Sequence, residues 1–420
     1  MLAHSPPLPL IIYYSTFNRD LTSEDEEGMI LALEQRDRVS HVRIHSPVQN
    51  LQKVAMVIDE EFPILEYLIM EPTVKDNTAL TLPGTFEAPR LRHLLLINFA
   101  LPMRSQFLTT AVGLVVLALT INHPPAYFQP NILLQCISLM PQLEMLTILF
   151  LFPVPNRDVE RQLMRTPITA PITLTLPNFR HFWFRGASAY FEAIICRIPA
   201  AHIEGMQIQL FEQLTFSIPH LVQFINTTEI FRFDSVELDF SDKRVCLDLY
   251  PRETGVSAFV IKVYSWHLDW QVSSAAQISI ALNQLYSAVE HLFLEHKLHG
   301  QSSEEHNEVN RSEWRKLLSS FSNVKTLRVG VRLVEELSRC LHFEDGELPL
   351  ELLPELQKLT YFGSRNAFTA FIDARQAAGR PVTLVQHRAS PFVSSLEAPT
   401  IISGSGKGSG KSESGNDLDA

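Results

Sequence analysis

The sequence has no long apolar run and no basic leader. Its longest apolar runs, AVGLVVLAL and MLTILFLF, have nine and eight residues, whereas a helix that crosses a bilayer needs about twenty. The N-terminus, MLAHSPPLPLIIYY, has no basic region and is interrupted by prolines, which is not typical of a secretory signal peptide. We therefore expect no membrane span and a cytoplasmic or nuclear location.

Basic residues and cysteines are also scarce. The chain has 35 Lys and Arg against 46 Asp and Glu, a net charge of −11. Phosphate binding needs a basic surface, so nucleic acid is not an expected partner. Cys136, Cys196, Cys246 and Cys340 lie 60, 50 and 94 residues apart, a spacing that fits neither a disulfide framework nor a metal motif. We expect buried thiols in a reducing compartment, and neither a metal nor a cofactor.

Catalytic motifs are absent as well. In GSGKGSGKS, Ser405 stands where a phosphate-binding loop needs its first glycine, and no helix pattern follows. In GASAY, Tyr190 stands where a nucleophile elbow needs its second glycine. EHLFLEHKLH contains His291, His296 and His299, but His291 and Glu295 are intermediate positions of a strand and point to the side opposite Leu292 and Leu294, which predicts a solvated strand and loop rather than a zinc site. The sequence therefore predicts that the chain is not an enzyme.

One short pattern, in contrast, recurs along the chain. It is apolar-x-x-apolar-x-apolar, as in LRHLLL after Pro89. Since 46% of residues are apolar, roughly one window in ten would match by chance, so the pattern alone is weak. Successive matches are 23 to 36 residues apart with one gap of 56, and five have a proline two residues ahead. The eleven matches begin at Val39, Leu65, Leu91, Leu114, Leu143, Phe179, Ile203, Phe233, Val289, Val324 and Leu356.

Helical patterns lie between the matches. In SEDEEGMILALEQ, Ser23 followed by Glu26 reads as a capping box at the start of a helix. PNILLQCISLM begins with Pro130, which the first helical turn tolerates well. PHLVQFI and RSEWRKLLSSF repeat an apolar face at helical spacing. The sequence therefore predicts an alternation of strand and helix along the chain.

This alternation predicts an α/β fold of the leucine-rich-repeat type. Each two-faced strand needs cover on its leucine side, and stacked units supply that cover, so a solenoid forms with a curved parallel sheet inside and helices outside. A doubly wound sheet is the alternative, but its strands read as continuous apolar runs. We expect an N-terminal cap segment over residues 1–22, an irregular solenoid of about eleven strands over residues 23–388 and a flexible Gly/Ser-rich tail over residues 389–420. Within the solenoid we expect an inserted β-hairpin near residues 245–264 and an exposed loop near residues 297–310.

Several longer stretches carry a further signal, among them DLTSEDEEGMILALEQRDRV, LPNFRHFWFRG, LTFSIPHLVQF, EWRKLLSSFSNVKTLRV and FIDARQAAGRPVTLV. In these stretches the chain resembles a group of F-box and leucine-rich-repeat-like proteins of mushroom-forming (basidiomycete) fungi, and the resemblance covers most of residues 5–388. It implies repeats that capture a substrate for a ubiquitin ligase. The F-box that docks on the ligase adaptor is not visible, since the repeats begin within about twenty residues of Met1, so adaptor binding is not expected.

The intermediate positions of the repeated strands predict the functional surface. They would line the open side of the sheet, with an apolar centre and charged ends, as a protein-binding surface has. The expected function is therefore binding of a protein partner, as the substrate-recognition part of a ubiquitin-ligase receptor or, alternatively, as a structural or decoy repeat with no ligase role. The candidate partner-binding residues are Arg43, Tyr67, His93, Leu95, Met145, His181, Trp183, Arg185, Gln207 and Phe293.

Overall fold

The structure is a computed structural model. It describes residues 8–15, 22–73, 79–100, 106–122, 126–151, 174–199, 202–211, 213, 215–228, 232–251, 257–297, 311–342, 352–363 and 367–387. The predicted tail over residues 389–420, all but the first residue of the predicted loop over 297–310, and most of the predicted cap segment over 1–22 lie outside these residues.

One fifteen-stranded sheet runs the length of the described chain, in the order β1-β2-β3-β5-β7-β8-β9-β10-β13-β12-β11-β14-β15-β16-β17. Neighbouring strands are parallel except where β12 pairs with β11 and β13. The strands are β1 Leu10–Ser15, β2 Val39–Ser46, β3 Tyr67–Pro72, β5 His93–Ile97, β7 Val116–Ile121, β8 Met145–Phe150, β9 His181–Gly186, β10 Gly205–Leu210, β11 Phe233–Ser241, β12 Arg244–Pro251, β13 Phe259–Tyr264, β14 His291–Lys297, β15 Thr326–Val329, β16 Lys358–Phe362 and β17 Thr383–His387, with a separate short pair, β4 Leu80–Thr81 and β6 Phe99–Ala100.

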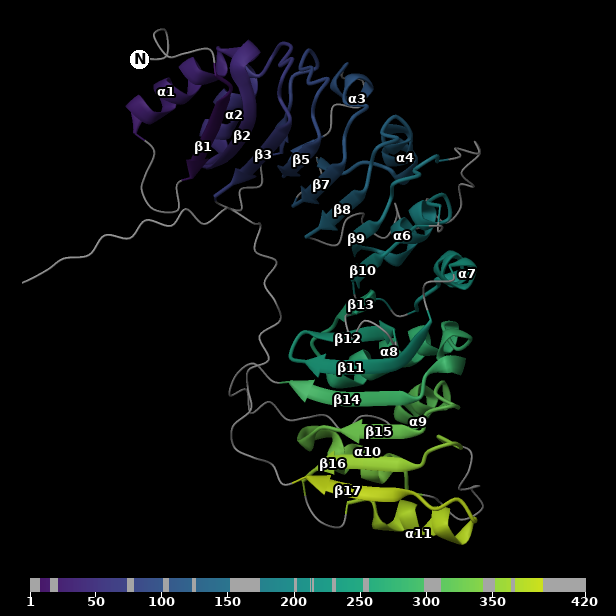
Figure 1. Cartoon of the computed structure of the whole chain (residues 1–420). Coiled ribbons are helices and arrows are strands. Elements are labelled where there is room, and N and C mark those ends of the chain that lie inside the picture. Colours follow the sequence, from purple (N-terminus) through teal and green to yellow (C-terminus); the bar gives the residue numbers. More distant parts are fainter. Residues whose placement is uncertain are drawn as a thin grey trace, which may run out of the picture.

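Helices follow most of the strands and lie on one side of the sheet. Figure 1 shows the sheet bent into an arc, with α3, α4, α6 and α7 on its outer side. The expected mixed α/β class, with a large and mostly parallel sheet, is confirmed. The helices are α1 Ser23–Leu33, α2 Val48–Val57, α3 Gln106–Thr110, α4 Pro130–Ser138, α6 Ser188–Ile195, α7 Pro219–Thr227, α8 Leu268–Ala281, α9 Arg311–Ser319, α10 Val334–Cys340 and α11 Thr369–Ala377.

All eleven matches of the repeated pattern form strands or lead directly into them. In the third match, Leu91, Leu94 and Leu96 are buried, while His93 and Leu95 between them are only half-buried. The alternation has a simple cause: successive side chains of a strand point to opposite faces, and only the leucine face is covered by helices. The buried residues of all units join one hydrophobic core that extends from Ile12 to Val382.

The first helix begins one residue earlier than its sequence pattern suggests. Thr22, not Ser23, is the N-cap: its hydroxyl accepts from the Asp25 backbone N–H at 3.1 Å. The Asp25 carboxylate in turn accepts from the Thr22 backbone N–H at 3.3 Å. Thr22 has the extended backbone that a cap needs, with φ −85° and ψ 160°. Thr22 with Asp25 and Ser23 with Glu26 both have the three-residue spacing of a capping box. Which of the two residues caps the helix depends on the backbone conformation, which the sequence pattern does not specify.

The region of the predicted hairpin rearranges the strand order. β12 and β13 occupy the predicted residues and pair antiparallel with each other. β12 also pairs antiparallel with β11, so β11, β12 and β13 form a meander. The chain leaves β10, passes to β11 and returns, so that β13 lies beside β10 and β11 lies beside β14. Two strands, β13 and β12, therefore stand between β10 and β11 in the sheet, because antiparallel strands need only short connections to pair locally.

Candidate functional site

The side of the sheet opposite the helices, here called the open face, carries the ten candidate residues. Strand β9 illustrates how it is built. Phe182 and Phe184 are buried in the core, where their rings pack against Phe191 of α6. Trp183 between them points the other way and is 40% exposed. β9 is hydrogen-bonded to β8 and β10 on its two sides, so the backbone that presents this indole is held at both edges.

The N-terminal end of the open face is a row of aromatic and imidazole rings. His41, Tyr67 and His93 are register partners on β2, β3 and β5. The centroids are 5.8 Å apart for His41 and Tyr67 and 5.5 Å apart for Tyr67 and His93. Burial lowers the pKa of His93, and the nearby Arg92 lowers it further. Arg43, two residues beyond His41, lies over the ring of Tyr13 at 5.6 Å, a cation–π geometry.

The centre of the open face brings four of the candidate residues together. Met145 and His181 are direct register partners on β8 and β9. Trp183 has Thr147 on one side and Gln207 on the other, the neighbours that the repeat phase predicts. Met145 is 38% exposed. A thioether, an imidazole, an indole and an amide therefore line adjacent positions of one rigid surface.

Arg185 extends this centre towards the end of the strands. Its guanidinium lies over the ring of Tyr264 at 4.6 Å from the centroid. The Tyr264 hydroxyl donates to Oε1 of Gln209 at 3.2 Å. Tyr264 belongs to β13, a strand next to β10 through the meander. The stacking orders the long arginine side chain, which lowers the entropy that binding would cost it.

The candidate residues do not all meet. Arg43 lies on β2, and β3, β5, β7 and β8 separate it from β9. Phe293 lies on β14, and the three strands of the meander, β13, β12 and β11, separate β14 from β10. Phe293 is the register partner of Glu237 on one side and of Arg328 on the other. The candidate set is thus a central group on β8, β9 and β10, a second group on β2, β3 and β5, and Phe293 apart from both on β14.

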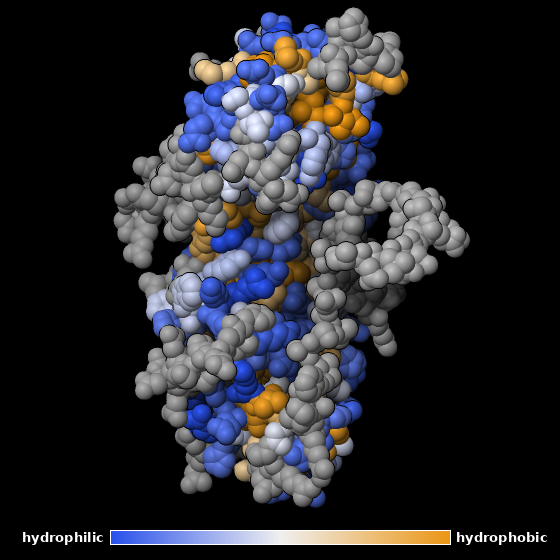
Figure 2. All heavy atoms as spheres, turned by 90° about the vertical axis from the view of Figure 1, so that its left-hand side faces the viewer, coloured by the Kyte–Doolittle hydropathy of each residue, from blue (hydrophilic) through white to orange (hydrophobic). Residues whose placement is uncertain are grey.

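The apolar centre expected for the open face is only partly present. Leu95 and other apolar residues of β5, β7 and β8 do point to this side, but most are half-buried, and Ile69 and Thr147 are buried. Figure 2, which looks onto this side, shows hydrophobic residues in the middle of the visible face interspersed with hydrophilic ones. Less apolar area therefore reaches solvent on this side than the sequence pattern indicates.

Some exposed aromatic residues were not predicted. Tyr13 on β1 is 65% exposed, and Trp266, just before α8, and Trp270, within α8, are exposed as well. The Lys243 ammonium lies 5.0 Å from the centroid of the Trp266 ring. Tyr264 could have been found, because the alternation of Lys262 and Tyr264 with buried neighbours is visible in FVIKVY. The tryptophans follow no periodic pattern.

Within the described residues, no group of three or more His, Cys, Asp or Glu side chains is placed to hold a metal ion. No helix in the same part of the chain has the length and apolar character to cross a membrane.

Comparisons with known proteins add little to this description. No protein-family model matches the chain, and no curated protein matches it. Among solved structures, the leucine-rich repeat-containing protein LegL7 from Legionella pneumophila is similar at 11% identity, covering 88% of this chain and 98% of that chain, with a TM-score of 0.30. A superposition this weak carries no weight for the fold. The assignment as an α/β protein with a large, mostly parallel sheet rests on the strand pairing.

Proposed function

We propose that the chain is a leucine-rich-repeat-like solenoid that binds a protein partner on its open face. The repeated strand–helix order and the arc of the sheet support the solenoid. The open face supports the binding role, because it exposes a concave surface on rigid strands while the opposite side is filled by helices. Sites on regular strands are held more accurately than sites on loops.

One observation carries the binding role, the exposure of Trp183 in the middle of the sheet. Its indole is 40% exposed although both chain neighbours are buried phenylalanines. Tryptophan is enriched among the residues that dominate binding energy, and a ring on a fixed strand loses little entropy when a partner covers it. Met145, His181 and Arg185 surround it with the mixture of apolar and cationic groups typical of such anchors.

The test compares Trp183→Ala with Trp270→Ala. Trp270 is exposed to a similar extent, 43%, but lies on α8 instead of the open face. A partner captured by proximity labelling in cells would be titrated against the wild-type chain and both variants. We expect Trp183→Ala to weaken binding by about 2 kcal/mol, roughly thirtyfold, and Trp270→Ala to leave it unchanged. Unchanged affinity in Trp183→Ala, with an intact fold, would reject the open face as the binding site.

The finer roles rest on the sequence resemblance alone and belong to this proposal. As the recognition part of a ubiquitin-ligase receptor, the chain would present a protein for ubiquitination. As a structural or decoy repeat, it would bind a partner without any ligase. We favour no enzymatic step in either case. Copurification of the purified chain with the ligase adaptor separates the two roles: we expect no stoichiometric complex at micromolar concentration, and its appearance would assign the chain to a ligase.

A further inference from the structure

The meander places four carboxylates together on the open face. Val236, Leu238 and Phe240 of β11 are buried, so Glu237 and Asp239 between them face the open side. By the same alternation Asp248 of β12 and Glu295 of β14 face the same side. The three strands are adjacent in the sheet, in the order β12-β11-β14. We call these four side chains the acidic block.

The carboxylates of the acidic block stand opposite one another. Glu237 is the direct cross-strand partner of Asp248, and Asp239 is that of Glu295. Like charges at directly opposed positions destabilise a sheet. Burial raises the pKa of Asp248 and also that of Glu295. The free protein therefore holds this arrangement at an electrostatic cost, one that a hydrophobic or amide side chain would avoid.

Cations inside the chain offset only part of that cost. Lys297 donates to Oδ2 of Asp239 at 3.0 Å and lies 3.7 Å from Oε1 of Glu237. Lys262 and Arg328 stand on the flanking strands β13 and β15, and Arg328 lies over the Phe362 ring. For Asp248 and Glu295, no ion pair within 4.0 Å occurs in the described part of the chain. Oδ1 of Asp239 is buried and accepts no hydrogen bond from any residue that the structure describes.

The acidic block is continuous with the surface around Trp183. The register places Trp183, Gln207, Val260, Asp248, Glu237 and Phe293 in one row across six neighbouring strands. Strands in a sheet are about 4.8 Å apart, so Asp248 is about 14 Å and Glu237 about 19 Å from Trp183 along the row. An extended chain covers about 3.3 Å per residue, and four to six residues span that distance.

We propose that the partner's contacting segment is basic: an apolar side chain lies on Trp183 and, about four to six residues away, lysine or arginine side chains lie over the acidic block. This inference rests on the proposed binding role of the open face and adds the chemistry of the partner to it. Charge complementarity decides the choice, because a basic segment relieves the opposed carboxylates, whereas an acidic segment or a nucleic acid would add to their repulsion.

The test uses two labelled peptides that differ only in charge, Leu-Ser-Ser-Ser-Lys-Lys and Leu-Ser-Ser-Ser-Glu-Glu, titrated against the full chain by fluorescence anisotropy. We expect the lysine peptide to bind at least about tenfold more tightly than the glutamate peptide. We expect the preference to shrink as ionic strength rises, since salt screens exposed charges. Equal binding of the two peptides, or tighter binding of the glutamate peptide, overturns the inference.

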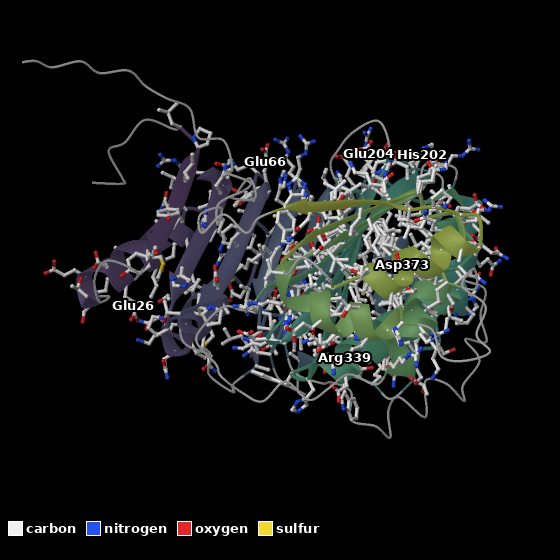
Figure 3. All side chains as sticks on the ribbon, turned by 90° about the horizontal axis from the view of Figure 1, so that it is seen from below. Glu26, Glu66, His202, Glu204, Arg339 and Asp373 are labelled. Carbon is white, nitrogen blue, oxygen red and sulfur yellow. The ribbon has the colours of Figure 1, made fainter. Side chains whose placement is uncertain are left out.

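The variant Glu237→Gln with Asp248→Asn locates the effect. Its control is Glu66→Gln with Glu204→Gln, which removes the same amount of charge at the edge where the strands begin; Figure 3 labels both residues along that edge. Like Glu237, Glu204 has a cationic neighbour, Arg180, at 2.6 Å. We expect the affinity of the first variant for the lysine peptide to fall about tenfold. The control variant should bind this peptide with the affinity of the wild type. Equal affinity in the two variants overturns the inference.

Two further readouts separate this inference from the proposed function. Removing opposed charges should leave the melting temperature of Glu237→Gln with Asp248→Asn equal to that of the wild type or above it. A clear decrease would mean that the carboxylates hold the fold together and would overturn the inference. If the lysine peptide does not bind preferentially but Trp183→Ala still weakens binding of a captured partner, only the proposed basic chemistry of the partner is wrong. If neither Trp183→Ala nor the acidic-block variant weakens binding of the partner, the binding role of the open face is wrong.

Discussion

A buried carboxylate between two helices makes a sharp prediction about pH. Glu192 of α6 is only 8% exposed. Its Oε2 accepts from the His220 backbone N–H at 2.7 Å, and its Oε1 accepts from the Leu221 backbone N–H at 3.1 Å. These donors belong to the first turn of α7, which begins with Pro219. The side chain thus caps the next helix and ties two consecutive helices together.

Burial raises the pKa of Glu192 from 4.5 to about 7, although the two backbone hydrogen bonds lower it. Between these two values the unfolded chain releases this proton while the folded chain keeps it. The contribution of Glu192 to stability is therefore complete below about pH 4.5 and is lost as the pH rises through about 7. A difference of about 2.5 pKa units corresponds to about 3 kcal/mol at 1.36 kcal/mol per unit.

The perturbation is Glu192→Gln, which cannot ionise. Glutamine has one acceptor oxygen for two donors, so one N–H loses its partner at a cost of about 1–3 kcal/mol. Because that loss and the gain from removing the charge are similar in size, the stability at a single pH does not decide the question. The change of the unfolding free energy with pH decides whether Glu192 has a raised pKa. Between about pH 5 and about pH 8 the wild type should lose about 2–3 kcal/mol more than the variant.

Urea unfolding at both pH values measures this difference, and exposed Glu144→Gln is the matched control. The control should follow the wild type at both pH values. Parallel pH dependence of the wild type and Glu192→Gln would refute the reasoning, because it would mean that the carboxylate is as easily ionised in the fold as outside it.

The other predictions concern the two faces of the strands. Leu94→Ala should lower the unfolding free energy by about 2–5 kcal/mol as a cavity, and His93→Ala should stay within about 0.5 kcal/mol; equal losses in chemical denaturation would mean a wrong register. Phe182→Ala should cost about 3–5 kcal/mol, whereas Trp183→Ala should melt close to the wild type, and the reverse order in calorimetry would exchange the two faces. Gly186→Ala should cost about 1–3 kcal/mol by overpacking, since an added Cβ would lie 2.7 Å from the Phe184 ring; an unchanged melting temperature would contradict the packing at this strand end.

Much of the local structure could be predicted from the sequence. The pattern of Leu91, Leu94 and Leu96 states which side of a strand is buried, because side chains alternate at a period of two. The same reasoning at β9 puts Phe182 and Phe184 inward and Trp183 outward, as observed. The neighbours of Trp183 followed as well, because consecutive repeats pair in parallel with equal phase.

Other features needed the folded chain. Thr22 rather than Ser23 caps α1, since the cap depends on backbone dihedrals that neither residue type specifies. The exposed apolar area of the open face is smaller than its pattern indicates, because Ile69 is buried and Leu95 is half-buried, and such burial depends on the neighbouring strands and not on the pattern of one strand. Arg185 and Tyr264 lie 79 positions apart in the sequence, and only the pairing of β10 with β13 brings them together.

The acidic block shows most clearly which features the sequence determines and which the tertiary structure determines. The alternation in SVELDF and RVCLDLY already directs Glu237, Asp239 and Asp248 away from the core. It does not say that Glu237 faces Asp248 or that Glu295 faces Asp239, because those pairs depend on whether the chain after β10 continues in parallel or turns back as a meander. The sequence by itself determined which side of each strand is buried, since that is a property of neighbouring residues. The tertiary structure decided which strands are adjacent, since pairing is settled by contacts between residues far apart in the chain.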